Sequence, residues 1–228
     1  MTATELVVAA HPDDEVLGCG GTIARRAAEG AEIHILILGE GATSRATTRA
    51  AGDTAMTDHL VECAQRAAGV LGAASVEVSG LPDNRLDGVD LLDVVKRIEA
   101  HIERHRPAVV YTQHGGDVNV DHRRIFEAVL AATRPQPGHP VREVLAYAVN
   151  SSTEWAFGTL APVFRAEVFV DISSTLATKS AALACYPDEL RPFPHPRSIE
   201  AVEAQARTWG AAVGVAAAEA FSVVRSIR

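Results

Sequence analysis

The chain has 228 residues, 47% hydrophobic and 22% charged, a composition that excludes a disordered protein and is typical of a globular one. Lysine and arginine total 21 against 29 aspartate and glutamate, so the net charge of −8 argues against nucleic acid or an anionic membrane as a partner. No apolar run reaches the length of a membrane span, and the first residues lack the basic start of a signal peptide. The three cysteines are scattered without disulfide or metal spacing, so we expect a cytoplasmic protein.

Apolar runs of strand length alternate with helical patterns along the chain. Strands are predicted at residues 6–10, 33–39, 75–80, 108–113, 143–149 and 168–173. Helices are predicted near 15–29, 58–72, 91–105, 121–133, 174–185 and 198–219, with a long loop at 40–55. No repeat, low-complexity tract or linker separates these elements, so residues 1–228 are expected to form a single domain.

Continuous apolar strands that alternate with helices predict an α/β fold: a single Rossmann-like domain with a mostly parallel twisted sheet and helices on both faces. A doubly wound sheet of order 3-2-1-4-5 makes the first and fourth strands neighbours. Two polar stretches, AHPDDE (10–15) and GGDVNVDHRR (115–124), follow these two strands. Because ligands bind beyond the carboxyl ends of such strands, we expect the two stretches to face each other.

The glycines of GCGGTIA (18–24) raise the alternative of a dinucleotide site. The G-x-G-x-x-G/A fingerprint must occupy the strand–helix turn itself, but HPDDE stands there and Ile23 takes the sixth position. The fingerprint is therefore absent. We predict instead that Gly18, Gly20 and Gly21 let the helix pack closely on the sheet.

A metal site fits the two polar stretches better. Four of the nine histidines lie in predicted strands or helices away from the strand ends, which leaves His11, His114, His122, His139 and His195 in or beside loops. His11 and Asp14 are three residues apart through a sharp turn, and His122 approaches from the neighbouring strand. Two imidazoles and one carboxylate with an open position are typical of a catalytic zinc site, where bound water has a pKa of about 7.

AHPDDEVLGCGGT and the D-x-x-x-D-H of GGDVNVDHRR together resemble the PIG-L/LmbE-like family, zinc hydrolases that remove acetyl from N-acetylglucosamine-type amines. The resemblance extends through SSTEW (151–155) and PHPRS (194–198). It implies that His11, Asp14 and His122 bind one zinc ion, which other divalent transition metals can replace. It further implies that Asp13 is the general base and that Asp121 orients a neighbouring histidine. Acids that merely favour a helix N-terminus would explain Asp13 and Asp14 but not the histidines.

The sequence departs from the family pattern at Asn119, where many relatives carry a histidine that polarises the acetyl carbonyl and protonates the leaving amine. Asparagine can hydrogen-bond to an oxyanion but cannot deliver a proton. Either Asp13 both takes the proton from water and protonates the leaving amine, or another acid contributes. His195 is the first candidate for that supplementary group and His114 the second, with an ordinary loop histidine as the alternative.

Substrate-binding residues are predicted in three loops. Ser44, Arg45 and Arg49 lie in the 40–55 loop, and an arginine there suits sugar hydroxyls or a phosphate, with solvated loop charge as the alternative for each arginine. The LPDNR stretch (81–85) resembles loops of a bacterial branch of the family, which implies that Asn84 and Arg85, with Asp83, grip the sugar. Glu154 and Trp155 are predicted to supply a hydrogen bond and a stacking face, although Trp155 as a packing residue stays open.

These predictions combine into a zinc-dependent N-deacetylase that acts on a small N-acetylated amino sugar, free or conjugated. The alternatives are a zinc amidohydrolase for another N-acyl conjugate and a noncatalytic carbohydrate- or metal-binding relative that lost its chemistry at Asn119. An intact Asp13 favours the enzyme, because a metal binder needs no extra carboxylate beside its ligands. The sequence leaves the aglycone and a homo-oligomeric state open.

Overall fold

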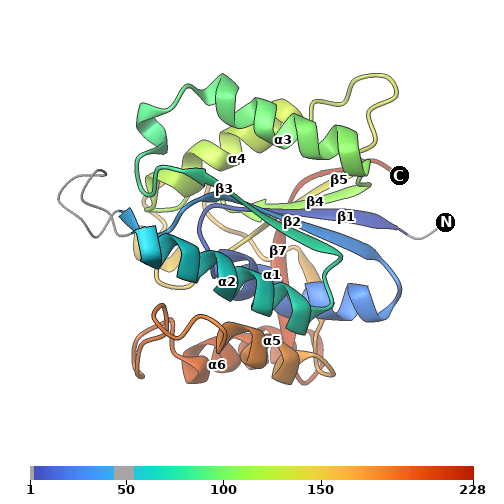
Figure 1. Cartoon of the computed structure of the whole chain (residues 1–228). Coiled ribbons are helices and arrows are strands. Elements are labelled where there is room, and N and C mark those ends of the chain that lie inside the picture. Colours follow the sequence, from blue (N-terminus) through green and yellow to red (C-terminus); the bar gives the residue numbers. More distant parts are fainter. Residues whose placement is uncertain (1–2, 44–53) are drawn as a thin grey trace.

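The computed structural model describes residues 3–43 and 54–228, which form one seven-stranded sheet of order β3-β2-β1-β4-β5-β7-β6. Its strands are β1 (Thr4–Ala9), β2 (Glu32–Gly39), β3 (Ser75–Leu81), β4 (Val109–Gln113), β5 (Glu143–Tyr147), β6 (Val168–Asp171) and β7 (Ala218–Ser226). The helices are α1 (Asp14–Ala28), α2 (Thr54–Leu71), α3 (Leu91–His105), α4 (Val120–Ala132), α5 (Leu176–Leu183) and α6 (Ile199–Val213). Figure 1 shows α3 and α4 on one face of the sheet and the other four helices on the opposite face. None of the helices in the described ranges is long and apolar enough to span a bilayer.

The predicted α/β architecture and the order of the first five strands are confirmed, and these strands pair in parallel. Both faces of β1 are buried: Val7 and Ala9 belong to the apolar core beneath α1 and α2, whereas Leu6 and Val8 belong to the core beneath α3 and α4. A strand covered on both sides needs an apolar residue at every position, which is why these strands appear as continuous hydrophobic runs.

The prediction of a helix that extends to residue 219 is wrong. Helix α6 ends at Val213, where Gly214 adopts a left-handed conformation with φ of 80°. The chain then returns as β7, which pairs antiparallel with both β5 and β6. Alanine has the highest helix propensity, so the alanine-rich stretch before Phe221 resembles a helix, but burial between two strands overrides that preference.

The predicted packing role of the α1 glycines is confirmed at two positions. A Cβ on Gly18 would stand 2.0 Å from the ring of Tyr147, and one on Gly21 would stand 2.7 Å from Ile172. At Gly20 the nearest side-chain atom would be 3.1 Å away, so the demand there is weaker. Helix α1 therefore packs closely on β5 and on the residue that follows β6.

Three histidines at the other end of the sheet make stability depend on pH. His34 stacks on His105 with ring centroids 3.6 Å apart, and His101 lies beside them. Glu32 and Glu77 each lie 3.4 Å from one of the rings. Burial lowers the pKa of His34 and of His105 below the ordinary 6.5, although Glu32 raises it in part.

A folded-state pKa below the unfolded value means that the unfolded chain binds more protons as the solution is acidified. The contribution of His34 is therefore complete above pH 6.5 and is lost as the pH falls below that value. We expect His34→Gln to flatten the dependence of the free energy of unfolding on pH between about 7 and 5. Urea unfolding of parent and variant measures this, and parallel pH profiles would contradict it.

Candidate metal centre and active site

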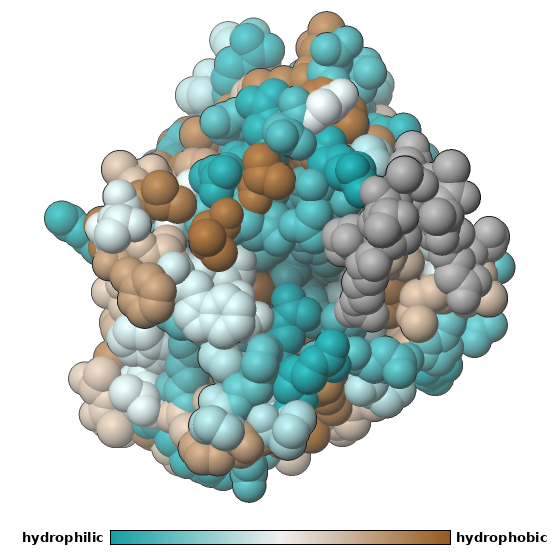
Figure 2. All heavy atoms as spheres, turned by 90° about the vertical axis from the view of Figure 1, so that its left-hand side faces the viewer, coloured by the Kyte–Doolittle hydropathy of each residue, from teal (hydrophilic) through white to brown (hydrophobic). Residues whose placement is uncertain are grey.

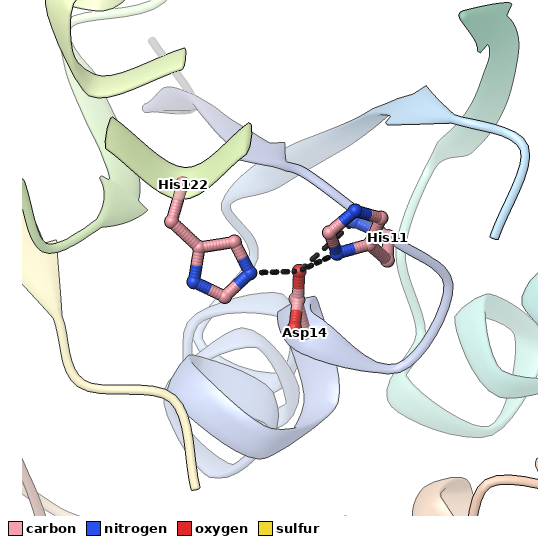
Figure 3. A group of neighbouring side chains, drawn as sticks. All are labelled: His11, Asp14 and His122. Atoms are coloured by element: carbon pink, nitrogen blue, oxygen red, sulfur yellow. Dashed lines mark hydrogen bonds and ion pairs between the residues drawn. The ribbon is translucent and has the colours of Figure 1, made fainter. Parts of the chain in front are cut away.

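Three buried side chains converge at the carboxyl edge of the sheet. His11 follows β1, Asp14 begins α1 and His122 lies in the first turn of α4. One oxygen, Asp14 Oδ2, lies 3.3 Å from His11 Nδ1 and 3.1 Å from His122 Nε2 (Figure 3). Two imidazole nitrogens around a carboxylate oxygen are the protein ligands of a catalytic zinc site that keeps one position open.

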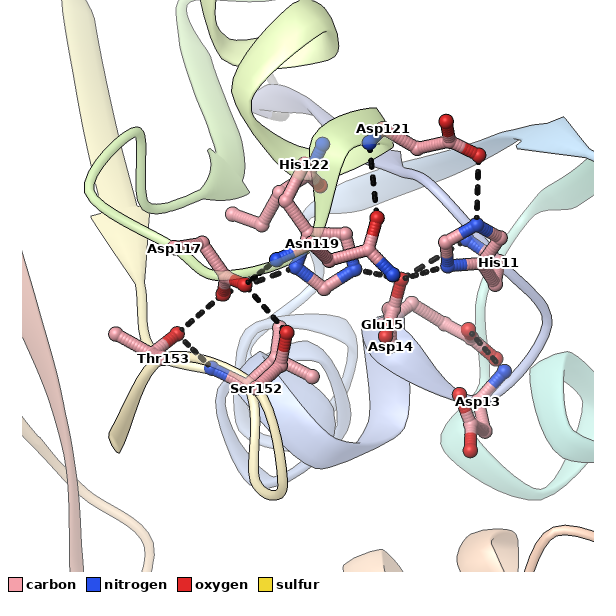
Figure 4. Close-up of polar contacts among 12 residues, drawn as sticks. His11, Asp13, Asp14, Glu15, Asp117, Asn119, Asp121, His122, Ser152 and Thr153 are labelled. Carbon is pink, nitrogen blue, oxygen red and sulfur yellow. Dashed lines mark hydrogen bonds and ion pairs between the residues drawn. The ribbon is translucent and has the colours of Figure 1, made fainter. Parts of the chain in front are cut away.

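The far nitrogen of each imidazole faces another carboxylate. His11 Nε2 lies 3.0 Å from Asp121 Oδ2, and His122 Nδ1 lies 3.0 Å from Asp117 Oδ2 (Figure 4). Because a carboxylate accepts the ring N–H on its side, the lone pairs of His11 Nδ1 and His122 Nε2 remain on the side of Asp14. Metal-binding histidines have this support in most proteins. The donor set therefore fits a divalent metal.

Both supporting carboxylates are themselves fixed. Asp121 accepts the backbone N–H of Asn84 at 2.6 Å and that of Leu86 at 2.9 Å. Asp117 accepts the hydroxyl of Thr153 at 2.7 Å, the hydroxyl of Ser152 and the backbone N–H of Asn119 at 2.8 Å. The sequence reasoning assigned no role to Asp117, although it begins the D-x-x-x-D-H motif. That motif is the signal that could have identified it.

A second group of donors shares His11. His11, Asp83 and Asp121 also hold three ligand atoms within 4.8 Å of one another. Here both carboxylates face one nitrogen, His11 Nε2, at 3.2 Å and 3.0 Å. The Asp121 oxygens already accept two backbone N–H groups, with which a metal would compete. We therefore interpret this group as the support of His11.

The charges of the cluster suit a cation. Burial lowers the pKa of His122, but Asp14 and Asp117 raise it to about 9. His11 likewise has a raised pKa, because Asp121 and Asp14 outweigh its burial. Burial raises the pKa of Asp14, and the two histidines bring it well below its ordinary range. In the absence of metal, protons on the imidazoles balance these buried carboxylates, and a divalent ion would replace them.

Asp13 stands beside this cluster in a strained backbone conformation. Its φ is 106°, in the left-handed region, and its side chain is buried. Among the described residues neither carboxylate oxygen of Asp13 has a hydrogen-bond partner, although Arg197 lies 3.2 Å from Oδ2. Its backbone N–H donates to Glu15, whose other oxygen accepts the hydroxyl of Tyr186 at 2.6 Å. Burial raises the pKa of Asp13, and the Arg197 guanidinium lowers it in part.

The loop at 191–198 reaches the site through Arg197. This guanidinium also lies 3.3 Å from Glu189 and donates to Ser151 Oγ at 2.8 Å. His195, the residue that the sequence favoured, packs edge-on against Trp155 and accepts the backbone N–H of Arg197. Arg197 lies in the PHPRS stretch, where only His195 was predicted to act in the site.

Asn119 caps α4 rather than standing free. Its side-chain oxygen accepts the backbone N–H of Asp121 at 2.8 Å, and its Nδ2 donates to Asn84 Oδ1 at 2.9 Å. His114, the second candidate acid, pairs with the backbone oxygen of Pro162 at 2.8 Å. Burial lowers the pKa of His114.

A small polar cavity of about 110 Å³ opens beside the cluster. Figure 2, which faces the carboxyl edge of the sheet, shows a hydrophilic hollow at its centre. The cavity is lined by His11, Pro12, Asp13, Gly41, Asp83, Asn84, Asn119, Glu189 and Arg197. Larger cavities of about 380 and 440 Å³ share none of these residues.

The structure brings only part of the predicted substrate-binding set to this cavity. Asn84 lines it, and the exposed Arg85 is the next residue. Glu154 is exposed and accepts backbone N–H groups of its own turn, and Trp155 is 44% exposed beside His195. Neither lines the cavity. Ser44, Arg45 and Arg49 lie outside the described residues.

Comparison with known proteins gives the family of the chain. The family model of the GlcNAc-PI de-N-acetylases (PIG-L) matches residues 6–133. Two curated relatives are an uncharacterized deacetylase, YaiS, of Escherichia coli and the 1D-myo-inositol 2-acetamido-2-deoxy-alpha-D-glucopyranoside deacetylase of Mycobacteroides abscessus. YaiS is 29% identical over 64% of this chain and 74% of its own length. The second is 35% identical over 56% of this chain, but the match spans only 54% of that relative.

Solved structures extend the likeness to the whole chain. The conserved protein TT1542 of Thermus thermophilus has a TM-score of 0.77 and 28% identity, with 100% of this chain and 97% of that one covered. GalB, the 4-carboxy-2-hydroxymuconate hydratase of Pseudomonas putida, has a TM-score of 0.73 and 25% identity over 98% of this chain and 96% of its own. The family model covers more than half of the chain, and the folds agree throughout, so this chain belongs to the PIG-L family.

Proposed function

We propose that the chain is a zinc-dependent hydrolase that removes the acetyl group from an N-acetylated amino sugar of the GlcNAc type. One observation carries the proposal: two imidazoles, each backed by a carboxylate, meet at Asp14 Oδ2 with a further buried carboxylate, Asp13, beside them. The deacetylases among the relatives support the reaction class. The small polar cavity suits a sugar hydroxyl or an acetamide rather than a macromolecule.

The residues of the site have separate roles in the proposed reaction. When bound by His11, Asp14 and His122, a divalent metal polarises a carbonyl and acidifies water. Asp13 takes the proton of the attacking water on a carboxylate oxygen and returns it to the departing amine nitrogen. Burial, which raises the pKa of Asp13, suits a group that must hold a proton between two steps.

Asn119 cannot share the proton transfer, since an amide is not an acid in this range. Its Nδ2 donates one N–H to Asn84 Oδ1, and its second N–H can hydrogen-bond to the acetyl oxygen without delivering a proton. Asp13 is therefore the group in the described site that we assign to both proton steps.

Metal analysis followed by a substrate panel tests the proposal. We expect about one divalent ion per chain and metal-dependent acetate release from N-acetylglucosamine or its conjugates. The panel contains the free sugar, a neutral and an anionic conjugate, and an N-acetyl amino acid, with products identified by mass. It also contains an unsaturated dicarboxylate, because GalB is a hydratase. Release from the amino acid alone would support the other amidohydrolase, water addition a hydratase, and no reaction a noncatalytic relative.

Substitutions of Arg197 and of His195 are expected to lower turnover by different amounts. We expect Arg197→Met to lower turnover by about 10²-fold, because the salt bridge that aims Asp13 is lost. His195→Ala should cost less, because His195 contacts Trp155 and the backbone of Arg197. Initial rates at saturating metal measure both variants. A greater loss in His195→Ala would mean that this imidazole reaches the acetyl group in the complex.

A further inference from the structure

Helix α1 is interrupted one turn after the residues of the candidate metal centre. Cys19 has φ of −144° and ψ of 21°, outside the helical region. In a regular helix the N–H of residue 21 would bond to the carbonyl of residue 17. A break at Cys19 leaves Leu17 O and the N–H groups of Gly21 and Thr22 in need of other partners.

A buried ion pair supplies those partners. Glu219, in β7, accepts the N–H of Gly21 at 2.9 Å and that of Thr22 at 2.7 Å. Lys179, in α5, donates to Leu17 O at 2.8 Å and to Glu219 at 2.6 Å. The two side chains thus stand where one hydrogen bond of the helix would have been.

Both members of the pair are buried, at 3% exposure for Lys179 and 4% for Glu219. Burying an ion pair is seldom favourable in itself, and replacement of such pairs by apolar residues often leaves stability unchanged. This pair bonds the backbone at the break in α1, which a contribution to stability alone would not require. It joins two elements beyond the family match at residues 6–133 to the one helix that begins with Asp14.

We infer that Lys179 and Glu219 are positioning residues, which hold α1 in its broken form and thereby fix the place of Asp13 and Asp14. This inference rests on the proposed function, since it gives that metal centre its support. Without the pair, Leu17 O and the N–H of Gly21 either form the regular helical hydrogen bond with each other or remain without a partner. In both cases the segment from Asp14 to Gly18 loses its fixed direction relative to His122, which lies on another element.

The test uses the double variant Lys179→Met/Glu219→Gln in the full-length protein. Both substitutions neutralise a charge, so the net charge is unchanged and any effect on metal binding arises from geometry. Ile102→Ala is the matched control, because Ile102 is a buried core residue of α3 on the other face of the sheet. The control separates a loss of position from a general loss of stability, which thermal unfolding records for both variants.

Two measurements decide the outcome. In metal-free protein we expect amide hydrogen exchange in residues 11–18 to become at least ~10-fold faster in the double variant and to stay at the parent rate in the control. We also expect the dissociation constant for Zn²⁺ to rise by ~10–100-fold, the range found when the support of metal ligands is lost. Unchanged exchange and unchanged Zn²⁺ affinity relative to the control would overturn the inference.

The two proposals fail in different ways. If the parent protein binds no metal, the proposed function fails, while the exchange rates of residues 11–18 still decide whether the ion pair fixes this segment. If the parent binds metal and the double variant behaves like Ile102→Ala in both measurements, only the positioning role fails.

Discussion

Asp13→Asn is expected to slow the proposed deacetylation by about 10²–10⁴-fold and to leave metal affinity unchanged, as expected for loss of a positioned general base. The side chain keeps its size, so the cavity beside His11 keeps its shape. What changes is that an amide cannot take a proton from water. Single-turnover rates at saturating metal, with zinc content measured on the same samples, test both halves of the prediction.

Loss of the Asp13 charge also frees Arg197, which lies between Asp13 and Glu189. Glu189→Gln is therefore the matched control, because it removes the other carboxylate partner of the same guanidinium. We expect a much smaller loss in that variant. Equal losses in the two variants would assign the effect to Arg197 rather than to a base, and loss of zinc in Asp13→Asn would make Asp13 a metal ligand.

The backbone of Asp13 connects this prediction to stability. A residue other than glycine with φ of 106° costs on the order of 1–3 kcal/mol, and such strain persists where the surroundings enforce it. Here the Glu15 carboxylate accepts the N–H of Asp13 and is itself bonded by Tyr186. Asp13→Gly should relieve the strain and raise the free energy of unfolding of the metal-free protein by about 1 kcal/mol, although activity is lost.

The sequence predicted those parts of the fold that depend on short-range pattern. Strands buried on both faces must be apolar throughout, so β1 and β2 were evident, and the order of the first five strands brought His11 and His122 to one edge. The strand β7 was missed because the alanine-rich stretch before Phe221 has no periodicity that separates a buried strand from a helix.

Several residues of the site could not be assigned from the sequence, and the reason differs from that for β7. Arg197 and Glu189 take part through the paths of loops, which depend on tertiary packing and not on spacing along the chain, whereas the spacing of the D-x-x-x-D-H motif does mark Asp117. Lys179 and Glu219 lie 40 residues apart, and their role follows only from the break at Cys19. No local sequence pattern shows that a charged side chain will be buried beside a broken hydrogen bond of a helix.

Asp14→Ala is expected to weaken zinc binding by more than the ~10–100-fold that loss of a supporting residue costs, because it removes the oxygen on which both imidazoles converge. Asp83→Ala is the matched control: it removes a buried carboxylate of the same cluster that faces the far nitrogen of His11 and accepts the side-chain N–H of Asn84. We expect that variant to stay within the supporting range. Metal content after dialysis at fixed free Zn²⁺ measures the difference.

Unfolding provides an independent readout of the same prediction. A metal that binds only the folded chain raises the free energy of unfolding by about 2.7 kcal/mol at a free concentration of 100 times its dissociation constant. At that Zn²⁺ concentration the parent should show this increase and Asp83→Ala a smaller one, about 0.4–1.4 kcal/mol for a site that is 10–100-fold weaker. Asp14→Ala should unfold at the same urea concentration with and without metal. If Asp14→Ala keeps one zinc per chain and Asp83→Ala loses it, the metal belongs to the group of His11, Asp83 and Asp121. The side of His11 that binds the ion would then be Nε2, and Asp14 would only orient the ring.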